Sequence, residues 1–492
     1  MLFIGIDIGT MHTKGILANE SGQIINKCVL NHSVKNHNMG WAEQDADQLW
    51  WAETVYVIRS LLVNSNAEDV VGIGVSGLFP CLLLADKNGR PLRSALLYSD
   101  NRALEELSCF RERFGLDLSG DSIPPKLAWL WSHEPDIVQQ TRYYFSSHNY
   151  VVFRLTGVYY LDYKVADSYG ALLNRDTLEW NIDVAQWAGF KVENLPKLFS
   201  ANEVVGQITK EAAKETGLKP GTPVIAGSGD SLLTLLGTGV VEKGDAALSF
   251  GTTGWLAGLT HDLKDFFNTP RLLNDGAPYK LSAYIITLCS ALEWLEEKLS
   301  PYKSQADNNG ETPFSIMDKK ALEIPAGAEG VIVLPNFHGS RSISEPNYEG
   351  KGIIYGLDLY HNSDHIYRAL LESFGYIVRQ SIERLKEQNI EIKRIICSGG
   401  GASSNAWRQI ISDILDYKLT YYENGDSCIG SAYLVSYSLG IQDSLSGITK
   451  WLNPPIETTP SRTETVKYKA PYNRFISIQD AFKTLDNIGV DK

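Results

Sequence analysis

Short apolar runs that stop at a glycine or a polar residue recur along the chain, and each predicts a buried strand followed by a turn. The first run extends from Leu2 to Ile8, is rich in β-branched residues and stops at Gly9. Further runs of this kind cover residues 70–75, 82–85, 224–226, 246–250 and 393–397. Segments with helical periodicity lie between them, so the pattern predicts an α/β protein.

The clearest helical pattern follows the first predicted hairpin, which turns at residues 19–22. Five positions, four of them apolar, fall on one helical face, with Asp45 or Asp47 as the expected N-cap. These positions are Trp50, Thr54, Val57, Ile58 and Leu61. A second helix is expected at residues 123–131, since its proline pair suits a first turn, and a third is expected to end at Gly157.

The strand and turn at the start of the chain return near its midpoint. The run at 246–250 leads into Gly251-Thr252, as the first run leads into Gly9-Thr10, and these pairs lie about half a chain apart. This spacing predicts two domains with related strand–turn–strand elements that face one ligand. We place the boundary after residue 243, which gives predicted domains of 1–243 and 244–492.

Composition and charge exclude several classes of protein. A chain of 492 residues is too long for one core, and its 43% hydrophobic and 21% charged residues are ordinary for a globular protein. A net charge of −13 argues against binding to nucleic acid or to anionic membranes. The six cysteines are scattered without a C-x-x-C pair, and no apolar run reaches the roughly 18 residues of a membrane span. We therefore expect a cytoplasmic enzyme without a zinc site or disulfides.

Asp7 is the first candidate for chemistry, because a carboxylate between isoleucines is costly to bury unless a cation or hydrogen-bond donors meet it. Gly9 lets the backbone turn closely, so that N–H groups and the hydroxyls of Thr10 and Thr13 can converge on an anion. These groups describe half of a clamp for a metal and nucleotide phosphates. A buried hairpin in which Asp7 caps a turn explains the same residues, and both interpretations stay open at this point.

Two glycine-rich turns are further candidates. Asp230 lies between the predicted strand at 224–226 and an apolar helical run at 232–236, where it either meets a ligand or caps the helix. Gly399-Gly400-Gly401 follow the strand at 393–397 and would let a flat group such as adenine or ribose lie against the backbone. Neither G-x-G-x-x-G nor G-x-x-x-x-G-K-[ST] is completed, which excludes a dinucleotide fingerprint and a P-loop.

Taken in order, the stretches around Asp7, Asp230, Gly251-Thr252 and Gly399-Gly400-Gly401 resemble the FGGY family of carbohydrate kinases. The likeness covers nearly the whole chain. It also includes residues 40–44, 125–129 and 154–157, and a stretch at 352–357 that leads to His365 and Glu372. The resemblance implies two ribonuclease H-like (actin-like ATPase) α/β domains with a catalytic cleft between them. It also implies that the N-terminal domain binds sugar and the C-terminal domain binds most of the ATP.

The resemblance assigns a role to each candidate. It makes Asp230 the general base toward the attacking hydroxyl, and Asp7 a holder of Mg²⁺ with its waters. Thr10 and Thr13 would meet the transferring phosphoryl group. The second phosphate loop would be Gly251, Thr252 and Thr253, and the adenosine would lie on Gly400, Gly401, Ala402 and Asn405. Phosphoryl transfer relies mainly on positioning and charge neutralisation, which agrees with these roles.

The predicted substrate-binding residues depart from familiar branches of the family. Xylulokinase-like members carry Gln-Met-His, and glycerol kinase-like members an Arg-Glu pair, where this chain has Leu78, Phe79 and Pro80. The loss of such polar contacts argues against D-xylulose and largely excludes glycerol. Asp100 and Arg102 match a family Trp-x-Asp-x-Arg pattern, and Arg102 is either a partner for a substrate carboxylate or structural.

The sequence thus predicts an ATP- and Mg²⁺-dependent kinase for a small substrate: a xylulose-like pentulose, a sugar acid such as gluconate, or a polyol. Two alternatives stay open, a non-kinase ATPase switch of the same fold and a sugar-binding sensor. No nucleic-acid or membrane partner is expected. Homodimers are common among such relatives.

Overall fold

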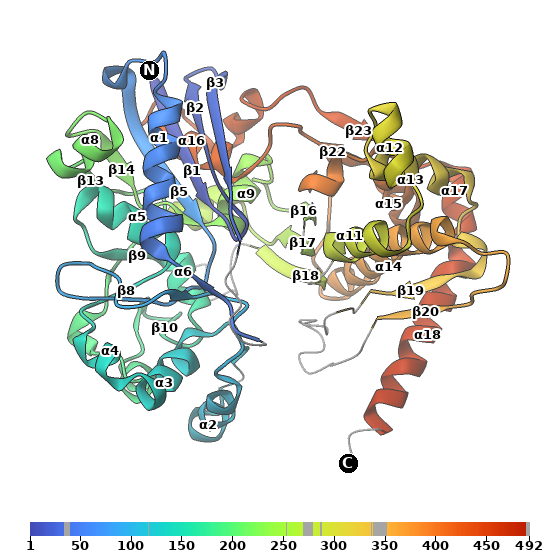
Figure 1. Cartoon of the computed structure of the whole chain (residues 1–492), viewed down its shortest axis with the longest axis horizontal. Helices are drawn as coiled ribbons and strands as arrows, with labels where there is room; N and C mark the ends of the chain where they lie inside the picture. The colour runs from blue at the N-terminus through green and yellow to red at the C-terminus, as the bar shows by residue number, and fades with distance from the viewer. Residues whose placement is uncertain are drawn as a thin grey trace. The chain divides into compact units, whose positions relative to one another are not determined.

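The protein is described by a computed structural model that covers residues 1–33, 40–116, 118–251, 253–268, 279–285, 288–335, 337 and 352–488 (Figure 1). Its contacts divide the chain into two compact units. The first unit comprises Met1–Val241, Asp262–Pro278 and Asn424–Leu452. The second comprises Glu242–His261, Tyr279–Glu423 and Asn453–Lys492. The predicted boundary after residue 243 stays a prediction.

The first unit is organised on one mixed sheet with strand order β13-β14-β5-β1-β2-β3, and β15 pairs with β5. Three strands form an antiparallel meander, and β5 and β14 extend it in parallel. The strands are β1 (Leu2–Ile8), β2 (His12–Asn19), β3 (Ile24–Asn31), β5 (Val70–Gly77), β13 (Val204–Gln207), β14 (Pro223–Ile225) and β15 (Ser228–Gly229).

Helices cover both faces of this sheet. Ile6 and Gly15 face α1 (Glu53–Leu61), since a Cβ on Gly15 would lie 2.5 Å from Val57 and 2.9 Å from Ile6. Gly5 faces the other way, because a Cβ there would lie 2.0 Å from the carbonyl oxygen of Cys428 in α16 (Ser427–Ser438). Successive residues of a strand point to opposite faces. Asp7 therefore lies on the α16 face, and its neighbours Ile6 and Ile8 lie on the α1 face.

The remaining elements of the first unit surround this sheet. The short strands are β4 (Glu43–Gln44), β6 (Leu83–Ala85), β7 (Ala95–Leu96), β8 (Tyr143–Phe145), β9 (Tyr160–Asp162), β10 (Leu173–Asn174), β11 (Glu179–Trp180) and β12 (Lys197–Phe199). The α-helices are α2 (Leu104–Phe114), α3 (Ile123–His133), α4 (Pro135–Gln140), α5 (Ser147–Thr156), α6 (Tyr163–Ser168), α7 (Ile182–Ala188), α8 (Lys210–Thr216), α9 (Asp230–Gly237) and α10 (Leu263–Asn268). Short helices of other types are η1 (Ala46–Ala52), η2 (Ala67–Asp69), η3 (Val192–Asn194) and η7 (Leu445–Lys450).

The second unit repeats this sheet, with strand order β18-β17-β16-β21-β22-β23. Again three antiparallel strands are followed by two parallel strands and one antiparallel edge strand. The strands are β16 (Asp245–Phe250), β17 (Gly254–Leu259), β18 (Tyr279–Ile285), β21 (Arg394–Ser398), β22 (Leu419–Tyr421) and β23 (Ile456–Thr458). The repeat of the first predicted strand and turn is therefore confirmed, as is the predicted fold class of two ribonuclease H-like α/β units.

The long helix α14 (Ser363–Glu387) is central to the second unit, where its buried residues share one core with those of α15 (Asn405–Leu415) and β16. The other helices are α11 (Leu288–Leu299), α12 (Lys303–Asn309), α13 (Pro313–Glu323), α17 (Arg462–Lys467) and α18 (Lys469–Ile488), with turns η5 (Ala328–Gly330) and η6 (Gly400–Ser403). A small hairpin joins β19 (Ile332–Leu334) to β20 (Ile353–Tyr355).

Several local predictions are confirmed. Trp50, Thr54, Val57, Ile58 and Leu61 are all buried, and the helices expected at 123–131 and before Gly157 are α3 and α5. Of the two expected caps, Asp45 accepts the Gln48 N–H, which leaves Asp47 for other contacts.

All six cysteines are free. Within the described ranges, no helix has both the length and the apolar character needed to cross a membrane.

Candidate active site

Asp7 lies at the carboxyl end of β1 and is almost completely buried. The Ser76 hydroxyl of β5 donates to its Oδ1 at 2.7 Å, and Lys14 Nζ of β2 lies 3.7 Å from its Oδ2. Both partners follow from the sheet register, because Asp7 pairs with Lys14 across the antiparallel ladder and with Ser76 across the parallel one. A donor and a cation thus meet the carboxylate, as its cost of burial requires.

The two threonines after Asp7 lie in different surroundings. Thr10 is half-buried in the β1–β2 turn, with its Oγ1 3.5 Å from the Tyr98 hydroxyl. Thr13 is fully buried, and its hydroxyl donates to the Leu49 carbonyl at 3.2 Å. Thr13 precedes Lys14 on β2 and so lies on the opposite face of the sheet from Asp7. Thr13 therefore lies at the same end of the sheet as Asp7, opposite Ile8, but its side chain points to the other face.

Asp230 is the first residue of α9, and Gly229 occupies the N-cap position. The simple reading of Asp230 as an N-cap is thus wrong. Helix α9 packs closely on α16, since a Cβ on Gly237 would lie 1.8 Å from the Asp426 carbonyl oxygen. Because α16 also packs on β1, Asp230 and Asp7 are held by the same layer of the first unit.

The Asp230 carboxyl is an unusually weak acid. Burial raises its pKa to about 7, and the charge of Asp7 acts in the same direction. The Ser231 backbone N–H and the Lys14 charge oppose this rise. Lys14 has a raised pKa, because Asp7 and other acidic groups outweigh its desolvation, so it stays charged. A carboxyl group with a pKa near 7 thus lies close to the charges of Asp7 and Lys14, an arrangement suited to proton transfer.

One aromatic ring lies against the residue that precedes Asp230. The ring of Phe79 lies on the backbone of Gly229, where a Cβ would come within 2.1 Å of its Cδ1. Only glycine permits this contact. Leu78, in contrast, is buried in the core of the first unit, and the Ser147 hydroxyl donates to its carbonyl oxygen. Of Leu78 and Phe79, only Phe79 is thus placed against Gly229, the residue before Asp230.

Asp100 and Arg102 are committed to contacts within the protein. The Asp100 carboxylate is fully buried and accepts from the Ala42 N–H at 2.7 Å and from the Arg102 guanidinium at 2.8 Å. Arg102 also pairs with Glu43 at 2.6 Å and lies 3.7 Å over the Trp41 ring. Its Nη1 is buried without a hydrogen-bond partner among the described residues. These contacts fix the segment around Trp41 and leave the two N–H groups of Nη1 unused among the described residues.

A buried polar cluster contacts β15, the strand that directly precedes Asp230. Asp162 accepts from the Ser228 hydroxyl at 2.8 Å, and its other oxygen is 2.9 Å from His148 Nε2. Asp162 also accepts the N–H groups of Lys164 and Val165 at the start of α6. Since Ser228 belongs to β15, two residues before Asp230, this cluster anchors the strand that presents Asp230.

In the second unit, the predicted nucleotide loops converge. β16 and β21 are parallel neighbours with Ser249 opposite Ser398, so the turn at Gly251 and the Gly399–Gly401 turn leave the same sheet edge. Gly399 has a φ of +87°, and a Cβ there would lie 2.9 Å from the Gly251 nitrogen. Gly400 is exposed with open space around it, as a surface for a ligand requires.

The other predicted nucleotide residues lie nearby with different exposures. Thr253 is half-buried and starts the return toward β17, and Gly401 lies tightly against the Trp407 ring. Ala402 is fully buried, and Asn405 is exposed at the start of α15. Thr252 lies outside the described residues.

A second group of potential metal ligands, Glu329, His361 and His365, lies in the second unit. Nδ1 of His361 accepts the Asp358 N–H at 2.8 Å, so the neutral imidazole carries its proton on Nε2. A protonated nitrogen is not a ligand, and this group therefore does not fit a metal.

Sequence reasoning missed Lys14, Ser76 and the Asp162 cluster. Lys14 stands seven residues after Asp7, and the residues around it do not by themselves predict a contact with Asp7. Only the pairing of β1 with β2 reveals this contact. The same register argument applied to the predicted hairpin would have found it.

Comparison with known proteins identifies the family. Residues 2–237 match the N-terminal domain, and residues 246–439 the C-terminal domain, of the FGGY family of carbohydrate kinases. The chain belongs to this family. It is an ATP-dependent sugar kinase.

Individual relatives extend over nearly the whole kinase. A xylulose kinase of Bacillus subtilis is 28% identical over 98% of this chain and 97% of its own. A gluconokinase of the same organism is 25% identical over 96% of this chain and 95% of its own. The crystal structure of a xylulose kinase from Rhodospirillum rubrum superposes with a TM-score of 0.85 at 25% identity, covering 99% of each chain.

Proposed function

We propose that the kinase transfers the γ-phosphate of ATP to a hydroxyl of a small polyhydroxylated substrate held by the first unit, with Asp230 as general base. The observation that carries this proposal is the Asp230 carboxyl, with a raised pKa of about 7, at the start of α9 and near Asp7 and Lys14. A base with a pKa near neutrality accepts a proton efficiently at physiological pH.

The proposed reaction moves one proton and one phosphoryl group. Asp230 takes the proton of the substrate hydroxyl while that oxygen bonds to the γ-phosphorus of ATP. The bond from the γ-phosphorus to the bridging oxygen breaks, and ADP leaves. Thr10, at the Asp7 end of β1, would donate to the transferring group, whereas the buried Thr13 would support the strand. We also propose that Lys14 acts as a second cation, which stabilises the negative charge that develops on the transferring phosphoryl group.

Asp7 is the proposed holder of Mg²⁺. Its carboxylate and that of Asp230 repel each other, which is visible in the raised pKa of Asp230, and a divalent cation would relieve this repulsion. Hard oxygen ligands with room for waters are what Mg²⁺ prefers. When bound, the ion would neutralise the phosphate charge, while Ser76 would hold the Asp7 carboxylate in place.

The second unit is the proposed site of ATP. The turn containing Gly251, Thr252 and Thr253 would meet the phosphates with its backbone N–H groups. The Gly400–Gly401 turn would lie under the adenosine, with Asn405 at its edge and the buried Ala402 in support. The shared sheet edge of β16 and β21 supports this proposal. We accordingly retain 1–243 and 244–492 as the sugar-binding and ATP-binding domains.

The proposed substrate is a small sugar or sugar acid, with a xylulose-like pentulose and gluconate as the first candidates and a polyol as the third. Phe79 would contact its carbon chain beside Asp230. Asp100 and Arg102 would act mainly by fixing the segment around Trp41, and Nη1 of Arg102 is the donor left for a carboxylate or hydroxyl. An ATPase switch or a sugar sensor would leave the Asp230 environment without a use. We also propose that the kinase acts in the cytoplasm, where ATP is supplied, and as a homodimer.

The test is ADP release from Mg-ATP with a panel of ketoses, aldoses, sugar acids and polyols. We expect one class to stimulate ADP release and to yield a phosphorylated product. A rate of ADP release that stays slow and does not change with any of these compounds would contradict the proposed substrate class.

A further inference from the structure

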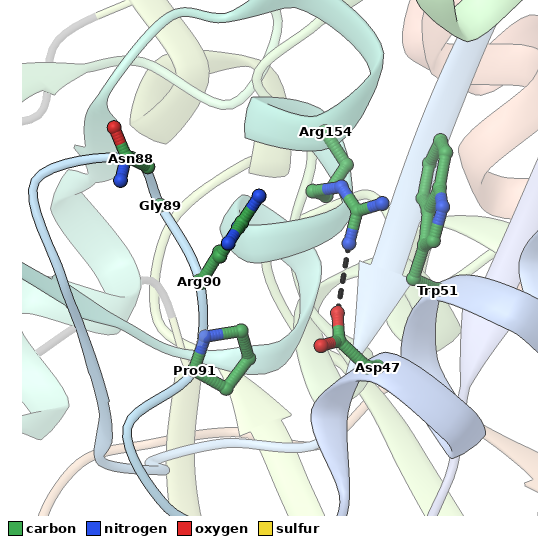
Figure 2. Close-up of a pocket in the computed structure, with 7 residues that line it drawn as sticks. All are labelled: Asp47, Trp51, Asn88, Gly89, Arg90, Pro91 and Arg154. Atoms are coloured by element: carbon green, nitrogen blue, oxygen red, sulfur yellow. Dashed lines mark hydrogen bonds and ion pairs between the residues drawn. The ribbon is translucent and has the colours of Figure 1, made fainter.

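A pocket of about 590 Å³ lies on the first unit, lined by Asp47, Trp51, Asn88, Gly89, Arg90, Pro91 and Arg154 (Figure 2). Asp47 and Trp51 come from η1, and Arg154 comes from α5. Both elements pack on the α1 face of the sheet, whereas Asp7 lies on the α16 face. The pocket is therefore separated from the Asp7 carboxylate by the sheet itself.

Arg154 is held rigidly at one side of this pocket. Its Nη1 donates to Asp47 at 2.8 Å and to the Tyr150 hydroxyl at 2.9 Å, and its guanidinium lies 4.5 Å over the Trp51 ring. The Trp51 ring is in turn fixed by Glu215, which accepts its Nε1–H at 2.9 Å. The cation is thus placed before any ligand arrives.

Arg90 supplies a second cation. Its exposed side chain extends from the turn after β6 toward Arg154 (Figure 2). Within the described part of the chain, its guanidinium donates no hydrogen bond. Its positive charge adds to the backbone hydrogen bonds that lower the pKa of the Asp86 carboxyl. Asp86 is itself occupied by the Asn88 and Arg90 backbone N–H groups. Arg90 and Arg154 outnumber Asp47, the one carboxylate among the lining residues, so the pocket keeps an excess of positive charge that an anion would neutralise.

We propose that this pocket binds a small anionic polyol, in which a phosphate or carboxylate group lies between Arg90 and Arg154. Planar guanidinium groups recognise both anions through paired N–H donors. The Asp47 carboxylate, which is about half exposed, would accept hydrogen bonds from the hydroxyls of the same ligand. Asn88 and Pro91 border the ligand's carbon chain. The site is independent of the proposed role of Asp230.

The first experiment measures binding of inorganic phosphate to the full-length, nucleotide-free kinase by calorimetry. Arg90→Gln is compared with Arg113→Gln, a matched change at an exposed arginine of α2 outside the pocket. We expect Arg90→Gln to weaken one phosphate-binding event by about tenfold, and Arg113→Gln to leave it unchanged. Equal binding by the wild type and Arg90→Gln, or equal weakening by both variants, would overturn the proposal.

A second variant has the opposite expected sign. Asp47→Asn removes the carboxylate that competes for Arg154, so inorganic phosphate should bind more tightly, whereas a simple loss of structure would weaken it. Glycerol 3-phosphate, gluconate and glycerol then distinguish the ligand class. The first two separate phosphate from carboxylate, and binding of uncharged glycerol with equal affinity would contradict an anion site. Wild-type turnover by Arg90→Gln without added anion would show that this site is separate from the chemistry.

Discussion

We propose different tasks for the carboxylates of Asp7 on β1 and Asp230 on α9. Asp7 is met by Ser76 and Lys14, while Asp230 is desolvated beside the Asp7 charge and has the raised pKa. Such a division gives one group for holding charge and one for moving a proton. Lys14 lowers the pKa of Asp230 but does not cancel the effect of burial.

The pH dependence of turnover follows from this difference. A general base must be ionised, so kcat/KM for the acceptor should fall about tenfold per pH unit below the pKa of Asp230 and level off above it; this pKa is about 7 without Mg²⁺ and should be lower with the ion bound. Initial rates at saturating Mg-ATP between pH 5.5 and 8.5 measure this limb. A flat profile over that range would exclude Asp230 as the titrating base.

Ser76 is expected to act through Asp7. In Ser76→Ala, Asp7 Oδ1 loses its donor, so the Mg²⁺ concentration for half-maximal activity should rise by about tenfold or more. Turnover at saturating Mg²⁺ should recover. Ser21→Ala, a change at an exposed serine, is the control. An unchanged Mg²⁺ requirement in Ser76→Ala would mean that Asp7 does not hold the ion.

At the scale of elements, the first unit depends on close approaches between backbones. Helix α16 contacts β1 at Gly5 and crosses α9 at Gly237 and Gly430, where a Cβ would lie 2.0 Å or less from a carbonyl oxygen. These contacts set the position of α9 and hence of Asp230. Apolar periodicity predicted the strands and helices, but it could not predict which helices cross, because contacts distant in sequence decide this.

Gly430→Ala tests this crossing. The added methyl would meet the Leu233 carbonyl oxygen, which forces α9 and α16 apart and should destabilise the protein by about 2 kcal/mol. Ser436→Ala on the same helix removes a buried hydroxyl without a hydrogen-bond partner among the described residues, and should be neutral or stabilising. Urea unfolding of both variants measures the difference. Equal stabilities would show that the helices adjust freely.

At the scale of the whole molecule, one sheet topology occurs twice with different chemistry at its ends. The first unit carries Asp7 and Asp230, and the second carries the glycine turns after β16 and β21. The sequence predicted this duplication because both halves repeat an apolar strand before Gly-Thr. It did not predict the partners of Asp7 or the burial of Thr13 and Leu78, because strand register and face decide which side chains reach a site.

A substitution in the second unit should therefore impair the binding of ATP without impairing the binding of the acceptor. Gly401→Ala would place a methyl 2.4 Å from the Trp407 ring and displace the proposed adenosine turn. We expect KM for ATP to rise by about tenfold with little change in KM for the acceptor. Steady-state kinetics with each substrate varied in turn measures both constants. An equal rise in both would contradict the assignment of ATP to this turn.

Phosphoryl transfer by Asp230→Asn is the most direct test of the proposed chemistry. The amide keeps the size of the side chain but cannot accept the proton, so acceptor-dependent ADP release should fall by 10²-fold or more. Calorimetry should still detect ADP binding, and Asp136→Asn, at an exposed aspartate of α4, should retain full activity. Wild-type turnover by Asp230→Asn would contradict the proposed role of Asp230 as the base of this kinase.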